Sequence, residues 1–160
     1  AAARLARKGP ETPPRKQARM QTFVVEIPEL GGAEVAIAPC PGKRERDLGQ
    51  DLDQLRGWGA EAVVTLVQAG ELELLRVQDM GNQVRGRGMK WFHCPIPDFS
   101  GPDGAFELAW VARGAGRGVR DILRSGGRAV VHCRGGIGRA GTVAAMLLVE
   151  LGVAPPEEAL

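Results

Sequence analysis

A glycine-rich turn in the last third of the chain constrains the fold more than any other feature. The segment HCRGGIGRAGT, residues 132–142, follows the short apolar run Ala129–Val131 and leads into the apolar stretch Thr142–Leu151. This order predicts a strand, a loop and a helix. Cys133 stands six positions before Arg139 in the loop. Backbone N–H groups of a loop that opens a helix can converge on one anion.

The residue types of this loop suit the binding and attack of a phosphate group. A free thiol is only about 3% ionised at pH 7, so a nucleophilic Cys133 requires surroundings that stabilise the thiolate. We expect the loop N–H groups and the Arg139 guanidinium to do this and to hold phosphate oxygens, with positive φ at the loop glycines. The alternative is a small buried cysteine in an ordinary turn. The candidate phosphate-binding residues are Arg134, Gly135, Gly136, Ile137, Gly138 and Arg139.

An acidic residue upstream fits the role of proton donor. Asp98 follows Pro95-Ile96-Pro97, which ends a strand-like run and places the acid on a constrained loop. A turn or cap aspartate is the alternative interpretation. Asp103 follows Pro102 at the start of a helix-like segment, so it is predicted to be a helix cap first and an acid second.

Taken together, these motifs resemble those of the cysteine-dependent phosphatases of the tyrosine and dual-specificity superfamily. HCRGGIGRAGT resembles the signature loop of that superfamily, and WFHCPIPDFSGPD, residues 91–103, resembles its general-acid segment. The segment 49–72 is similar to the corresponding part of the kinase-associated phosphatases and their bacterial relatives. The resemblance covers residues 39–160.

The resemblance implies a role for each matching residue. Cys133 would be the nucleophile, Arg139 the phosphate clamp and Asp98 the general acid, with His132 and Thr142 in support. It implies hydrolysis of phosphotyrosine, phosphoserine or phosphothreonine through a phosphocysteine, with no cofactor and no metal. The expected partner is a phosphorylated protein, and the family's association points to a kinase.

Two departures from the family pattern bear on the second half of the reaction. Ala140 stands where relatives often have a serine or threonine whose hydroxyl assists departure of the sulfur, and Thr142 lies two residues further on. The relatives also continue into a helical segment whose glutamine positions the hydrolytic water. Here residues 155–158 open what resembles that helix, and the sequence ends at Leu160. We therefore expect hydrolysis of the intermediate to be slow.

Strand-like and helix-like segments alternate along the chain. Strands are predicted at 23–27, 35–38, 62–67, 91–94 and 129–131, and helices at 48–55, 103–124 and 142–151. Three glycines weaken the second helix and predict a break there. The expected fold is α/β: a mostly parallel central sheet flanked by helices, like that of dual-specificity phosphatases. Cys133 falls beyond a strand's carboxyl end, where such folds bind ligands.

Residues 1–19 hold most of the positive charge. Their net charge is +5, and since the whole chain carries +2, residues 20–160 carry −3. This proline-rich segment has too little apolar surface to fold, so we expect a disordered tail that is dispensable for catalysis, followed by a phosphatase domain over residues 20–160. The basic tail could contact nucleic acid or acidic lipid or act as a targeting arm, but a disordered extension is the preferred interpretation, and we expect no nucleic-acid or membrane partner. Its basic residues are Arg4, Arg7, Lys8, Arg15, Lys16 and Arg19.

Other interpretations make different predictions. His93-Cys94 and His132-Cys133 could suggest a zinc site, but adjacent residues on a strand point to opposite faces. A phosphopeptide-binding module that does not catalyse, an arsenate reductase and a sulfurtransferase could each use a similar loop. Three cysteines without a Cys-x-x-Cys pair favour a reducing compartment, so we expect a cytoplasmic protein. We also expect it to be a monomer.

Overall fold

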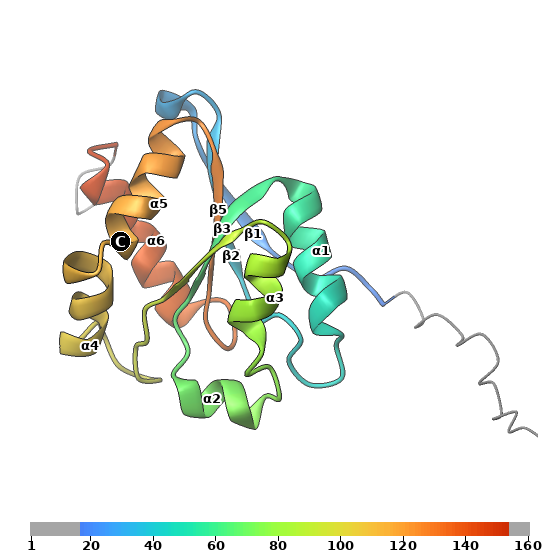
Figure 1. Ribbon diagram of the computed structural model, residues 1–160. Helices are drawn as coiled ribbons and strands as arrows, with labels where there is room; N and C mark the ends of the chain where they lie inside the picture. Colours follow the sequence, from blue (N-terminus) through green and yellow to red (C-terminus); the bar gives the residue numbers. More distant parts are fainter. Residues whose placement is uncertain (1–16, 154–160) are drawn as a thin grey trace, which may run out of the picture.

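A five-stranded sheet between two helical layers forms the body of the protein (Figure 1). The computed structural model describes residues 17–153. The elements in chain order are β1 (Phe23–Ile27), η1 (Pro28–Leu30), β2 (Ala33–Ala38), α1 (Leu48–Trp58), β3 (Ala60–Thr65), α2 (Ala69–Leu74), α3 (Met80–Gly86), β4 (Lys90–His93), α4 (Gly104–Glu107), η2 (Leu108–Ala112), α5 (Ala115–Arg124), β5 (Arg128–His132) and α6 (Gly138–Glu150).

The sheet confirms the predicted α/β class. Its strand order is β1-β2-β5-β3-β4. β1 pairs antiparallel with β2, and the other neighbours pair in parallel. The predicted strand at 23–27 matches β1, and the other four predicted strands overlap β2, β3, β4 and β5. Since β2, β3 and β5 are parallel neighbours, their carboxyl ends meet at one edge of the sheet, and the loop of Cys133 begins there.

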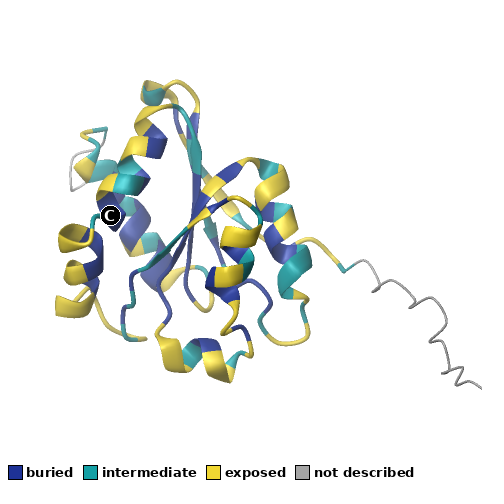
Figure 2. Ribbon diagram, in the orientation of Figure 1, coloured by how far each residue is buried: buried dark blue, intermediate teal, exposed yellow. Residues whose placement is uncertain are grey.

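Two apolar clusters fill the space on either side of the sheet. One packs α4, α5 and α6 against one face, with Phe106, Val119 and Leu147 among its buried members. The other packs α1, α2 and α3 against the opposite face, with Leu52, Leu72 and Met80 buried. Figure 2 shows that buried residues run along the sheet and the inward sides of the helices. Strands with both faces covered have continuous apolar runs, as β3 has at Ala62–Val64 and β5 at Ala129–Val131.

The predicted helix over 103–124 is broken, as its glycines suggested. α4 and η2 end before Gly114, whose φ of +81° is left-handed, and α5 starts at Ala115. The two parts still present their apolar side chains to the same cluster, since Phe106, Trp110 and Leu123 are buried.

α2 and α3 were not predicted from the sequence. α2 has six residues and α3 has seven, too short to show a clear helical period. The packing of Leu72, Met80 and Val84 into the second cluster holds these helices in place.

Part of the segment assigned to the tail contacts the domain. Gln17 donates from Nε2 to the Asp51 carboxylate at 2.8 Å, and the carbonyl of Ala18 accepts from Arg46 at 2.6 Å. The rest of the expected tail, and the helix expected at 155–158, lie outside the described residues.

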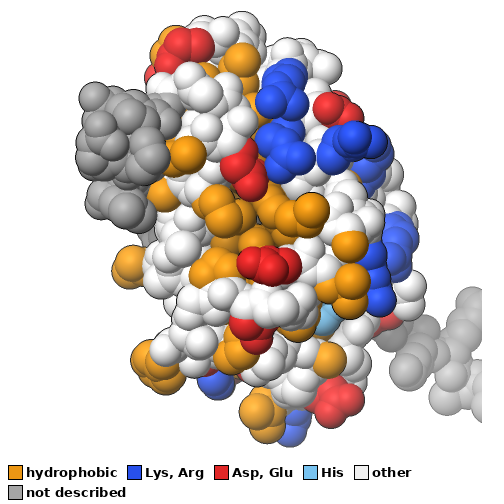
Figure 3. Space-filling view, turned by 90° about the vertical axis from the view of Figure 1, so that its left-hand side faces the viewer, with side chains coloured by type: hydrophobic (Ala, Val, Ile, Leu, Met, Phe, Trp, Pro, Cys, Tyr) orange, Lys and Arg blue, Asp and Glu red, His pale blue; other side chains and the backbone are white. Residues whose placement is uncertain are grey.

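The side of the molecule formed by α4, α5 and α6 exposes both hydrophobic and charged side chains (Figure 3). Figure 3 shows hydrophobic side chains in the middle of this face and basic side chains beside them. Leu108 and Val111 of η2 are among the exposed apolar residues. Within residues 17–153 no helix has both the length and the hydrophobicity to cross a bilayer.

Candidate active site

The loop of residues 133–137 joins β5 to α6 at the carboxyl edge of the sheet. β5 ends at His132, and α6 begins at Gly138. The predicted start of this helix at Thr142 is therefore wrong by four residues. The loop is shorter than the glycine-rich segment 132–142, because Gly138, Arg139 and Gly141 all belong to the helix.

Gly136 is the loop position where a side chain cannot be accommodated. Its φ is +86°, and a Cβ built there would lie 2.7 Å from the backbone nitrogen of Pro39 and 2.9 Å from the carbonyl carbon of Ala38. Both the dihedral and the close approach to the end of β2 require glycine. Gly135 and Gly138 do not have positive φ, so that expectation holds for Gly136 alone.

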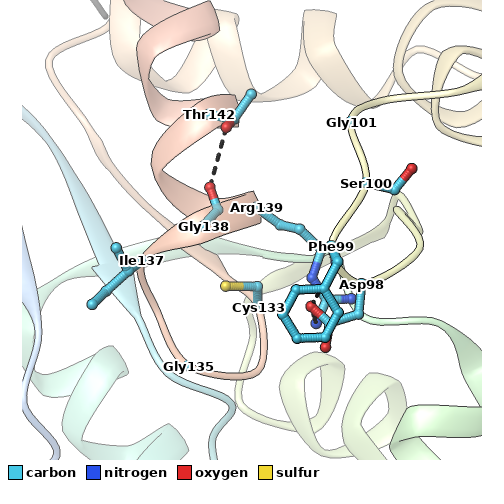
Figure 4. Close-up of a pocket in the computed structure, with 10 residues that line it drawn as sticks. All are labelled: Asp98, Phe99, Ser100, Gly101, Cys133, Gly135, Ile137, Gly138, Arg139 and Thr142. Atoms are coloured by element: carbon cyan, nitrogen blue, oxygen red, sulfur yellow. Dashed lines mark hydrogen bonds and ion pairs between the residues drawn. The ribbon is translucent and has the colours of Figure 1, made fainter.

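Cys133 lies at the base of a pocket of about 490 Å³. The residue is buried, 3% exposed, and its Sγ accepts a hydrogen bond from the backbone N–H of Gly136 at 3.3 Å. In Figure 4 Cys133 lies between Ile137 on one side and Asp98, Phe99 and Arg139 on the other. The pocket is lined by Asp98, Phe99, Ser100, Gly101, Cys133, Gly135, Ile137, Gly138, Arg139 and Thr142.

The Arg139 guanidinium is held on one edge and open on another. Nη1 donates to Glu71 at 2.8 Å and to the carbonyl of Ile96 at 2.9 Å, while Nη2 donates to the other Glu71 oxygen at 2.9 Å. A guanidinium carries five N–H groups. These contacts use both N–H groups of Nη1 and one of Nη2, so the edge formed by Nε and Nη2 keeps two N–H groups without a hydrogen-bond partner among residues 17–153.

Asp98 lies at that open edge. Its Oδ1 is 3.4 Å from Nη2 of Arg139, and its side chain is 40% exposed. The same oxygen accepts a hydrogen bond from the backbone N–H of Phe99. Phe99 has a left-handed φ of +57°, and its side chain is fully exposed. The structure thus brings the predicted nucleophile, arginine and acid around one pocket, although they come from two segments far apart in the sequence.

Glu71 is a site residue that sequence reasoning missed. It lies in the first turn of α2 and also accepts a hydrogen bond from the backbone N–H of Gln68 at 2.8 Å. Burial raises the pKa of Glu71, but the hydrogen bonds from Arg139 and Gln68 outweigh burial and lower it below its usual value. The signal in the sequence was Gln68-x-x-Glu71, which reads as a helix cap and gives no hint of Arg139.

His132 supports the loop from beneath the sheet edge. Its ring is fully buried, and burial lowers the pKa of His132 from 6.5 to about 4, so it is neutral at pH 7. Nδ1 lies 3.1 Å from the carbonyl of Cys133, and Nε2 lies 2.7 Å from Oγ1 of Thr65. Trp91 donates to that same Thr65 hydroxyl at 2.7 Å. This chain of hydrogen bonds connects β4 and β3 to the first residue of the loop.

Neither Ala140 nor Thr142 offers a free hydroxyl to the pocket. The Thr142 hydroxyl lines the pocket but donates to the carbonyl of Gly138 at 3.1 Å, one turn back in the helix (Figure 4). Ala140 is fully buried in the apolar cluster beneath α6. The side chain of Arg134 is exposed, and its carbonyl accepts from the backbone N–H of Cys40 at 3.1 Å.

Asp103, Cys40 and Cys94 do not line the pocket of Cys133. Asp103 caps α4: its Oδ1 accepts from the backbone N–H groups of Ala105 and Phe106 at 3.1 and 3.2 Å. Cys40 and Cys94 are fully buried, and burial raises the pKa of each thiol to about 12. Within residues 17–153 no three His, Cys, Asp or Glu side chains cluster in a way that could hold a metal.

Comparison with known families agrees with this geometry. Residues 42–160 match the family model described as the DSP-PTPase phosphatase domain of Swiss Army Knife proteins. The chain belongs to the DSP-PTPase family. It is therefore a phosphatase domain of the dual-specificity and tyrosine phosphatase type, and the predicted resemblance is confirmed.

Two relatives with the same name are similar over most of the chain. Cyclin-dependent kinase inhibitor 3 of Rattus norvegicus is 30% identical over 72% of this chain and 53% of its own length, and the Mus musculus protein is 27% identical over 78% and 57%. The chain thus spans little more than half the length of these curated relatives.

Solved structures share the fold. Kinase-associated phosphatase with its catalytic cysteine changed to serine superposes with a TM-score of 0.76 at 23% identity, covering 90% of this chain and 82% of that one. Tk-PTP in its active form superposes with a TM-score of 0.59 at 30% identity, covering 79% and 74%.

Proposed function

We propose that this domain is a metal-independent protein phosphatase that hydrolyses phosphomonoesters through a phosphocysteine at Cys133. The observation that supports this most is the arrangement around one pocket: a buried thiol, the open edge of the Arg139 guanidinium and the Asp98 carboxyl. A phosphate held by the loop N–H groups and by Nε and Nη2 of Arg139 would present its phosphorus to the sulfur.

The first step transfers the phosphoryl group to the enzyme. The Cys133 thiolate attacks phosphorus, the S–P bond forms, and the bond between phosphorus and the ester oxygen breaks. Asp98 donates its proton to the departing oxygen, so the leaving group departs as an alcohol or phenol. Arg139 holds two of the non-bridging oxygens throughout.

The second step regenerates the thiolate. A water molecule attacks phosphorus, the ionised Asp98 accepts its proton, and the S–P bond breaks to release inorganic phosphate. Helix α6 begins directly after the loop, and its N-terminal end favours the thiolate that departs.

Turnover of p-nitrophenyl phosphate in the presence of a metal chelator tests this function. The parent should release p-nitrophenol catalytically, and Cys133→Ser should be inactive. Equal rates in the two proteins would contradict the proposal. A non-catalytic phosphopeptide-binding module would turn nothing over, and a sulfurtransferase would instead consume thiosulfate.

Substrates of this phosphatase would be phosphorylated proteins. The relatives named cyclin-dependent kinase inhibitor 3 and kinase-associated phosphatase motivate a kinase as partner. The cytoplasmic location and monomeric state expected from the sequence accompany this proposal.

A further inference from the structure

A second hollow adjoins the pocket of Cys133. It has a volume of about 520 Å³ and lies between the segment 19–23, the loop after β2 and the outer side of the phosphate loop. Gly135 and Ile137 line both hollows, so the two are neighbours across Ile137. The groove is lined by Arg19, Met20, Gln21, Thr22, Phe23, Ile37, Pro39, Lys43, Arg46, Gly135, Gly136 and Ile137. We call it the flanking groove.

Large apolar side chains stand exposed in the flanking groove. Phe23 is 69% exposed and Ile137 is 83% exposed. Phe23 is the first residue of β1, an edge strand of the sheet. Exposed aromatic and aliphatic side chains that share a hollow next to a reactive site are typical of a ligand-binding surface.

The charge of the flanking groove is positive. Arg19 and Lys43 line it, and no described residue that lines it is acidic. Arg46 is committed to Asp51 at 2.8 Å, whereas the ion pairs found within residues 17–153 do not include Arg19 or Lys43. Lys43 donates from Nζ to the carbonyl of Arg134 at 3.1 Å, which places its charge against the phosphate loop.

We propose that the flanking groove binds the peptide segment next to the phosphorylated residue of a protein substrate, and that it selects segments with an acidic and an apolar side chain. This inference rests on the proposed phosphatase function. An extended peptide advances about 3.3 Å per residue, so a chain whose phosphate lies at Cys133 would enter the neighbouring groove within about two or three residues. The apolar side chain would contact Phe23 and Ile137, and the acidic one would lie near Arg19 and Lys43.

Matched phosphopeptides test the preference. One peptide carries Glu and Leu at the three positions on each side of the phosphorylated residue, and the other carries Lys and Ser there; each is made with phosphotyrosine and with phosphothreonine. We expect the parent to have a kcat/KM about tenfold higher for the Glu/Leu peptide, with a preference that falls as salt rises. Equal values for the two peptides would overturn the inference.

Two exposed residues of the groove supply the variants. Arg19→Glu and Phe23→Ser should each cut the preference to less than about threefold and leave turnover of p-nitrophenyl phosphate unchanged, because neither residue lines the pocket of Cys133. Arg117→Glu and Val111→Ser, which line a separate hollow at η2 and α5, are the matched controls and should keep the full preference. The assignment would be contradicted if the control variants lost the preference for the Glu/Leu peptide. It would also be contradicted if the groove variants kept that preference in full.

The outcomes separate this inference from the proposed function. If the parent does not hydrolyse p-nitrophenyl phosphate, the function fails, and the groove is still tested by titrating the two peptides into Cys133→Ser. Arg19→Glu could instead slow hydrolysis of a phosphorylated lipid in anionic vesicles and leave kcat/KM unchanged for both peptides. In that case the groove binds a membrane surface, and the peptide inference is overturned.

Discussion

Glu71 and Arg139 are 68 positions apart in the sequence, yet both oxygens of the Glu71 carboxylate accept hydrogen bonds from the Arg139 guanidinium, at 2.8 and 2.9 Å. Burial lowers the pKa of Arg139 and the contact with Glu71 raises it, with a net rise, so the guanidinium stays charged. The pair fixes which edge of Arg139 faces the pocket. Glu71 is therefore a positioning residue for Arg139, the proposed phosphate clamp.

Removing the Glu71 charge should impair the clamp. We expect Glu71→Gln to lower kcat/KM for p-nitrophenyl phosphate about 10- to 100-fold and to weaken inhibition by inorganic phosphate, because Arg139 is no longer held by two charged contacts. The loss of a partner for a buried cation should also destabilise the fold by about 3 kcal/mol. Glu73→Gln, an exposed residue of the same helix, is the control for both measurements. Unchanged phosphate inhibition in Glu71→Gln would show that Glu71 serves stability alone.

The stability of the fold should depend on pH through His132. In the folded protein burial lowers the pKa of His132 to about 4, while an unfolded histidine has a value near 6.5. Between these values the unfolded chain binds a proton that the folded chain does not, so stability is complete above pH 6.5 and is lost as pH falls toward 4. The loss should be on the order of 3 kcal/mol, measured by denaturant unfolding.

Substitution of the histidine identifies the source of that pH dependence. His132→Asn should lose most of the slope between pH 6.5 and 4, even if it is less stable at every pH. His93→Gln should keep most of the slope, since burial is the largest cause of the lowered His132 pKa and the nearby His93 adds only a smaller contribution. A slope that survives in His132→Asn would assign the titration to another group.

Loss of Asp98 should lower the catalytic rate, whereas loss of Asp103 should lower the stability of the fold. Asp98→Ala should slow hydrolysis of poor leaving groups by about 10² to 10⁴ and of activated aryl phosphates much less, because only poor leaving groups need the proton. Asp103→Ala should keep these rates and lower stability by about 1 kcal/mol, since Asp103 caps α4. The leaving-group dependence of kcat/KM and thermal melting measure the two effects. The opposite pattern would make Asp103 the acid.

The features that were predictable from the sequence are local ones. β1 matched its prediction because the mostly apolar run Phe23–Ile27 is followed directly by Pro28, and the Cys133 loop is encoded in consecutive residues. Asp103 was recognised as a cap because its partners lie two and three residues away.

The features that were missed depend on contacts between distant segments. Glu71 meets Arg139 only because α2 follows β3 at the same sheet edge as the loop. The flanking groove needs the segment at Arg19, the loop at Lys43 and the side chain of Ile137 to converge. No spacing within the sequence records such a meeting, because the sheet order places these segments side by side.

The second half of the reaction gives the last prediction. Attack by Cys133 requires the loop, Arg139 and Asp98, all of which line the pocket, but Ala140 offers no hydroxyl to the departing sulfur. We therefore expect rapid mixing with an aryl phosphate to give a burst of about one equivalent of product per enzyme, followed by a slower steady state. Acid quenching should trap phosphocysteine at Cys133.

Two hydroxyl variants locate the missing assistance. Ala140→Ser should raise the steady-state rate and leave the burst rate unchanged, because the new hydroxyl can donate to the sulfur only when the S–P bond breaks. Thr142→Val should change neither rate, since the Thr142 hydroxyl already donates to the Gly138 carbonyl at 3.1 Å. A linear time course from the first turnover, unaltered in Ala140→Ser, would show that breakdown of the intermediate is not limiting. If the parent has a linear time course and Thr142→Val shows a burst, then the Thr142 hydroxyl leaves the Gly138 carbonyl during the reaction and supplies the proton that Ala140 cannot.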